Sequence, residues 1–88
     1  MNNHWFDVTY VNGICYQANK TCHGWEIQLT KIGAKHSTWL KSRRNGKNTF
    51  TCDFLYAKHY TTEAKALEVI QELINDNMIE HMLKGEQA

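Results

Sequence analysis

The sequence predicts an α+β domain, in which an antiparallel β-meander of three to five strands packs against a C-terminal α-helix. Two Asn-Gly pairs, Asn12-Gly13 and Asn45-Gly46, are flanked by segments that alternate between apolar and polar residues, as in β-hairpins. After residue 60 the apolar residues recur every three or four positions, which is the period of a helix. Eighty-eight residues make one domain, with residues 1–60 as the sheet, 61–84 as the helical part and 85–88 as a frayed tail.

The first hairpin is predicted around Asn12-Gly13, because both residues tolerate the positive φ values that a two-residue type I′ turn requires. The strand pattern then breaks at residues 21–24. A third strand is expected in "WEIQLT", residues 25–30, where apolar and polar residues alternate again, and Gly33 should lie in the next turn. The pattern leaves open how the first hairpin pairs with the rest of the sheet.

The second hairpin is centred on Asn45-Gly46. A two-residue turn there places Arg44 opposite Lys47, and regular pairing continues from that point. The helix-covered face should then hold Trp39, Phe50, Cys52 and Phe54, with Lys41 and Arg43 on the same side nearer the tip. The outer face should hold Thr38, Leu40, Ser42, Arg44, Lys47, Thr49, Thr51 and Asp53.

The helix should begin at Thr61-Thr62, because threonine is a favourable N-cap and Glu63 adds a negative charge to the first turn. The apolar stripe predicted to lie on the sheet is Ala66, Leu67, Ile70, Leu73, Ile74 and Met78. The Asn-Asp-Asn run at residues 75–77 weakens the helix. Beyond it, Ile79, Met82 and Leu83 predict either a short second helix or an apolar patch for a partner or a homodimer.

Composition narrows the class of protein. A chain that is 42% hydrophobic and 22% charged is typical of a globular domain, and its apolar runs are too short to span a membrane. The N-terminal residues do not have the pattern of a secretory signal. Cysteines at 15, 22 and 52 are an odd number, so reduced thiols and a cytoplasmic location are expected.

The net charge of +1 conceals an asymmetry. Residues 1–60 carry eight Lys and Arg against three acids, whereas residues 61–88 carry two lysines against six acids. Either one face of the molecule prefers anions, or the two parts attract each other.

Neither a metal site nor a catalytic site is predicted. The potential metal ligands do not have the paired spacing of zinc sites; they are Cys15, Cys22, His23, Cys52 and His59. The histidines and cysteines belong to no recognisable nucleophile–base motif. We therefore expect a protein that is not an enzyme and uses no cofactor.

The basic residues around the second turn predict a nucleic-acid site. Arg44 and Lys47 repel each other across the turn, and a bound anion would relieve that repulsion; the alternative is that the charges only protect a strand edge. The residues predicted to bind phosphates, or an acidic partner, are Lys31, Lys35, Lys41, Arg43, Arg44, Lys47 and Thr49, with Thr51 as a further neutral donor. Tyr16 would stack on a base if its side chain lay on the outer face.

The segment from Trp25 to Ile74 resembles the three-strand-plus-helix DNA-binding modules of AP2 proteins and of integrase N-terminal arms. The resemblance lies in "WEIQL", the basic hairpin "KSRRNGK" and the helix start "YTTEAKALEVI", whereas "LYAKHYTT" replaces the usual Gly-x-Phe before the helix. It implies a sheet that enters the major groove and a helix that supports the sheet from behind.

In size and format the chain also resembles small phage and mobile-element proteins, among them anti-CRISPR inhibitors. This second resemblance implies an alternative function, the inhibition of a host-defence nucleoprotein by protein–protein contact. The inhibitor would use the basic tip, or else the acids at positions 63, 68, 72, 76 and 80 as a nucleic-acid mimic.

Overall fold

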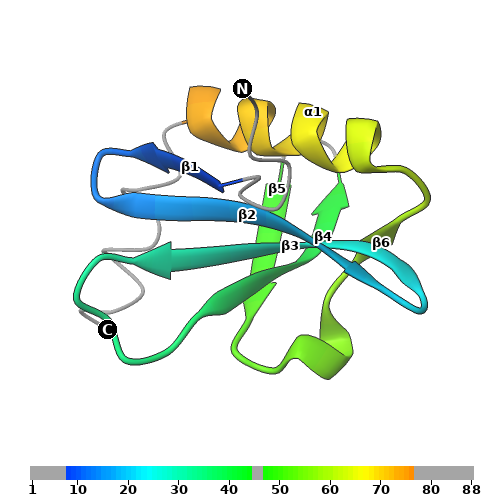
Figure 1. The fold of residues 1–88 in the computed structure, drawn as a ribbon, viewed down its shortest axis with the longest axis horizontal. Helices are drawn as coiled ribbons and strands as arrows, with labels where there is room; N and C mark the ends of the chain where they lie inside the picture. Colours follow the sequence, from blue (N-terminus) through cyan, green and yellow to red (C-terminus); the bar gives the residue numbers. More distant parts are fainter. Residues whose placement is uncertain (1–7, 45–46, 77–88) are drawn as a thin grey trace, which may run out of the picture.

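The computed structural model describes residues 8–44 and 47–76 and has the predicted α+β architecture (Figure 1). In these residues one antiparallel sheet is covered on one face by a single α-helix, α1 (Glu63–Asn75). The strands are β1 (Val8–Val11), β2 (Ile14–Thr21), β3 (Gly24–Lys31), β4 (Thr38–Arg44), β5 (Lys47–Thr51) and β6 (His59–Tyr60), and a 3₁₀ helix, η1 (Phe54–Tyr56), follows β5. Strands β1 to β5 lie side by side in chain order, so the meander is confirmed, while β6 pairs with β3.

Tight turns set the register of the first three strands. Asn12 and Gly13 have φ values of 52° and 84°, as a type I′ turn requires, and Val11 pairs with Ile14 across it. The break predicted at residues 21–24 is a second two-residue turn, in which Thr21 pairs with Gly24. Gly24 has a φ of 126°, and a Cβ atom there would lie 2.5 Å from the carbonyl oxygen of Tyr60. Only glycine fits at this contact between β3 and β6.

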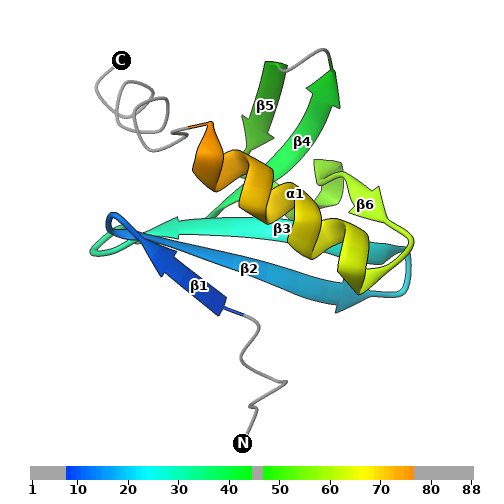
Figure 2. The same cartoon turned by 90° about the horizontal axis from the view of Figure 1, so that it is seen from above.

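The β4–β5 hairpin diverges from the rest of the sheet, as Figure 2 shows. Strand β3 pairs with β4 at only two positions, Gln28 with Trp39 and Leu29 with Thr38. The first half of β3 pairs with β6 instead, and the Lys58 N–H donates to the Leu40 carbonyl at 2.8 Å. Residues 58–60 therefore fill the gap that opens between β3 and β4.

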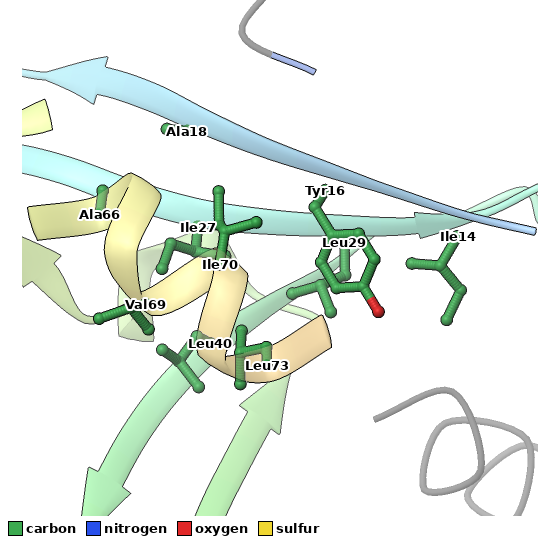
Figure 3. Packing of buried hydrophobic residues seen from close by; sticks show 10 residues of the cluster. All are labelled: Ile14, Tyr16, Ala18, Ile27, Leu29, Leu40, Ala66, Val69, Ile70 and Leu73. Carbon is green, nitrogen blue, oxygen red and sulfur yellow. The ribbon is translucent and has the colours of Figure 1, made fainter. Parts of the chain in front are cut away.

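The core lies between α1 and the sheet (Figure 3). Its buried members are Ile14, Tyr16, Ala18, Ile27, Leu29, Leu40, Ala66, Val69, Ile70 and Leu73. Tyr16 is only 2% exposed, so its side chain does not lie on the outer face and the condition for its stacking on a base is not met. It lies on the same face of β2 as Ile14 and Ala18, because side chains along a strand alternate between faces.

The helix begins and faces the sheet largely as predicted. The Thr62 side chain accepts a hydrogen bond from the Lys65 N–H at 3.1 Å, which confirms the N-cap. The predicted stripe needs one correction, because Val69 is buried whereas Leu67 is 40% exposed. The helix contacts the sheet along positions 66, 69, 70 and 73, and residue 67 lies about 100° around the helix from residue 66.

The described part of α1 ends at Asn75, the first residue of the Asn-Asp-Asn run that was expected to weaken the helix. The Asp76 N–H donates to the Glu72 carbonyl. Met78, the remainder of the predicted helical part and the predicted patch of Ile79, Met82 and Leu83 lie outside the described residues. Within residues 8–44 and 47–76, no helix has the length and apolar character needed to cross a membrane.

Candidate nucleic-acid interface

The β4–β5 hairpin follows the predicted register at its tip and departs from it at Lys41. Arg44 pairs with Lys47 and Arg43 with Asn48, as expected, and Ser42 pairs with Thr49. The next pair is Leu40 with Phe50, so Lys41 is the extra residue of a β-bulge. A bulge reverses the faces of the residues beyond it in the same strand. The predicted faces therefore hold for β5 and for the part of β4 near the tip, and they fail for the part of β4 before Lys41.

Five predicted side-chain positions are wrong for this reason or because β5 ends early. Leu40, expected on the outer face, is fully buried in the core, and Thr38 pairs with the buried Leu29. Trp39, expected in the core, lies on the opposite face from Leu40. Cys52 and Phe54 were also expected in the core, but β5 ends at Thr51 and both are exposed.

Arg43 lies on the helix side of the hairpin and is fully engaged there. Its guanidinium donates to the Asn48 side-chain oxygen at 2.7 Å. It also forms ion pairs with two acids of the helix segment, Glu72 at 2.8 Å and Asp76 at 3.5 Å. Arg43 was predicted to bind phosphate, but these contacts neutralise it and attach the hairpin to α1. The basic body and the acidic segment attract each other at this point.

Tyr60 lies beside this ion pair, and its titration reflects three influences. Burial raises the pKa of the Tyr60 phenol, the Arg43 charge lowers it and the Glu72 charge raises it, and the net shift is upward. The neutral phenol is therefore the form that the folded protein prefers.

The outer hairpin face, defined here as Ser42, Arg44, Lys47, Thr49 and Thr51, points away from α1. Arg44 and Lys47 are both exposed and directly opposed, and the Ser42 and Thr49 hydroxyls below them are hydrogen-bonded at 2.6 Å. Among the residues that the structure describes, no carboxylate lies within ion-pairing distance of Arg44 or Lys47. The like charges at the tip are therefore not compensated by these residues.

The predicted basic residues do not form one site. Lys31 and Lys35 lie at or just beyond the end of β3, before β4 begins, whereas Arg44 lies at the far end of β4. Six residue steps along β4 separate the two ends by about 20 Å, and Figure 2 shows the loop and the tip well apart. The outer hairpin face thus retains Arg44, Lys47 and Thr49 of the predicted set.

Sequence reasoning missed an exposed apolar ridge beside the hairpin, formed by the η1 residues Phe54, Leu55 and Tyr56. Their exposed fractions are 50%, 76% and 62%. The Phe54 ring packs edge-on against Trp39 with centroids 6.1 Å apart, and the Lys41 ammonium lies 5.9 Å from the centre of the Tyr56 ring. These contacts join the η1 ridge to the outer side of the hairpin. The signal in the sequence was Asp53, a capping residue directly before the apolar triplet, which ends the strand.

A polar cluster holds Trp39 in place. Its indole N–H donates to Glu26 at 2.9 Å, and the His59 Nε2 atom lies 3.4 Å from the other oxygen of the same carboxylate. Glu26 is only 8% exposed, and the indole N–H supplies the hydrogen bond that its buried carboxyl group needs. The His23 and His59 rings are 5.7 Å apart. In the described ranges, no three His, Cys, Asp or Glu side chains group as metal ligands would.

The comparisons with known proteins identify no relative. The chain matches no protein-family model, no curated protein and no solved structure.

Proposed function

We propose that this domain is a non-catalytic binding protein that engages nucleic acid through the outer hairpin face. The observation that carries the proposal is the direct opposition of Arg44 and Lys47, both exposed. Like charges at facing positions destabilise a hairpin, and a phosphate between them removes that cost.

The distribution of charge about the hairpin supports the same function. Arg43 takes up Glu72 and Asp76 on the helix side, so these acids are engaged away from the outer face. The other cations of the hairpin are Lys41, Arg44 and Lys47, and all three are exposed. The acid that follows the hairpin in the sequence is Asp53, which is also exposed. Three cations neutralise at most about three phosphates, so the affinity should be modest and strongly dependent on salt.

The proposal is tested by titrating labelled DNA and RNA at about 50 and 200 mM salt. The variant Arg44→Ala with Lys47→Ala should weaken binding and reduce the slope of log affinity against log salt by about two. Lys20→Ala with Lys35→Ala is a matched control, because it removes two exposed cations outside the hairpin. No binding at the lower salt, or equal losses in the two double variants, would exclude the outer hairpin face as the site.

A second candidate is an inhibitor that acts by protein–protein contact, and the η1 ridge favours it. Three consecutive large apolar side chains exposed together are typical of an interaction surface. The ridge and the basic tip would then meet an apolar and acidic protein surface. The nucleic-acid-mimic version has less support, because Glu72 and Asp76 pair with Arg43, and Glu68 lies 3.6 Å from Lys65. A host protein that stays bound to the immobilised domain after nuclease treatment, and is released by Arg44→Glu with Lys47→Glu, would support the inhibitor.

A further inference from the structure

We infer that the nucleic acid taken by this interface is single-stranded, with an unpaired base stacked on the η1 ridge and the adjoining phosphates on the hairpin cations. The inference rests on the proposed function and assigns a second, base-binding part to the same site. It uses Tyr56 and Phe54, neither of which is among the residues predicted from the sequence to bind phosphates.

Exposed rings provide the stacking surface. Tyr56 is 62% exposed and Phe54 is 50% exposed, although aromatic side chains of this size normally gain stability by burial. A base offers a flat apolar face that covers such a ring, irrespective of its sequence. In a duplex those faces are already covered by neighbouring base pairs, except at its two ends, so an unpaired base stacks here more readily than a paired one.

The platform is held in place before any ligand binds. The Asp53 carboxylate accepts from the Leu55 N–H at 2.9 Å at the start of η1, and the Ala57 N–H donates to the Phe54 carbonyl at 3.2 Å at its end. Directly beyond it, the Lys58 N–H is bonded to the Leu40 carbonyl of β4. Little conformational entropy should therefore be lost when a base stacks on the ridge.

Lys41 links the stacking ring to the phosphate contacts. The β-bulge leaves this residue unpaired in the ladder, and its ammonium lies over the Tyr56 ring at 5.9 Å from the ring centre. A nucleotide whose base covers Tyr56 would bring its phosphate within reach of that ammonium. Arg44 lies three residues farther along β4, about 10 Å away, and continues the line of positive charge toward the tip.

Three labelled probes of equal length test the inference: a twelve-nucleotide thymidine strand, a twelve-base-pair duplex and a twelve-residue abasic strand. The thymidine strand should bind more tightly than the other two. Tyr56→Ala and Tyr56→Leu should each weaken its binding about tenfold and leave the abasic strand unaffected, whereas Tyr56→Phe should bind normally. Tyr10→Ala is the matched control, because Tyr10 is an aromatic residue on β1 with 67% exposure. Circular dichroism of each variant checks the fold.

The outcomes separate the two proposals. If none of the probes binds at low salt, the proposed function and this inference both fail. If the duplex and the abasic strand bind as well as the thymidine strand, and Tyr56→Ala changes nothing, the outer hairpin face binds phosphate but the stacking inference is wrong. If Tyr56→Ala releases a protein partner while no nucleic acid binds, the ridge is a protein contact and the inference is also wrong.

Discussion

The Arg43 guanidinium lies 2.8 Å from the Glu72 carboxylate, and this ion pair joins the β4–β5 hairpin to α1. Its neighbour Arg44 points to the opposite face and pairs across the strand with Lys47. Two adjacent arginines therefore have different roles, because successive side chains of a strand point to opposite sides. One holds the hairpin against the helix, and the other is exposed and has no ion-pair partner within the described part of the chain.

Removing either partner of this ion pair should destabilise the domain modestly. A double-mutant cycle with Arg43→Ala and Glu72→Gln should give a coupling energy of about 0.5–1 kcal/mol, because the two side chains are 20% and 41% exposed and water screens them. The coupling should shrink in 1 M salt. Urea denaturation of the four proteins measures it.

The pair Lys65–Glu68 is the control for that cycle. Its side chains are more exposed, at 52% and 57%, and lie 3.6 Å apart on one helix. Its coupling should be no more than about 0.3 kcal/mol. A coupling for Arg43–Glu72 as small as this would show that the pair does not fasten the hairpin in solution.

Gly24→Ala should be far more damaging than Gly13→Ala. Both glycines have positive φ, but a Cβ at Gly24 would meet the Tyr60 carbonyl oxygen at 2.5 Å, whereas nothing lies within 4 Å at Gly13. We expect a loss of about 1 kcal/mol at Gly13 from backbone strain alone, and of 3 kcal/mol or more at Gly24. Thermal and urea unfolding measure both losses, and similar values would contradict the close approach of β3 and β6.

Two leucines of α1 provide a test of which face of the helix meets the sheet. Leu73 is fully buried and Leu67 is 40% exposed. Leu73→Ala should therefore lower the free energy of unfolding by about 2–5 kcal/mol. Leu67→Ala should cost less than about 1 kcal/mol, since alanine is the better helix former and no cavity is left. Equally large losses at the two positions would support the stripe expected from the sequence, which includes both leucines.

Stability should decrease at alkaline pH. Burial raises the pKa values of Tyr16 and Tyr60 above the ordinary value of about 10. The folded state thus prefers the protonated phenols, so their contribution is complete below pH 10 and is lost as the pH rises through the raised folded-state pKa values. Urea denaturation at pH 8 and at several values above 10 measures this loss.

Tyr16→Phe with Tyr60→Phe is the control for the alkaline loss. Phenylalanine does not ionise, so the double variant should lose less stability between pH 8 and pH 11 than the unmodified protein. The same pH dependence in both proteins would show that other groups cause the loss.

The sequence by itself determined the parts of the fold that depend on neighbouring residues. Asn12-Gly13 specifies its turn because both residues tolerate positive φ, and Thr62 specifies the helix start because its side chain caps a free N–H. The pairing of Arg44 with Lys47 follows in the same way from the predicted turn. The opposed cations of the candidate site were therefore predictable.

Only the tertiary structure decided what lies on each face beyond the tip. The bulge at Lys41 puts Leu40 in the core and Trp39 outside, and no local pattern marks it. Strand β4 must pair with β3 at Trp39 and meet residue 58 at Leu40, and these partners are distant in the chain. The Arg43–Glu72 ion pair and the edge-on contact of Phe54 with Trp39 are likewise contacts between distant segments. Such contacts form only when the elements pack together. This is why the sequence indicated a basic hairpin, whereas the fold decided which of its cations pair with acids among residues 8–44 and 47–76.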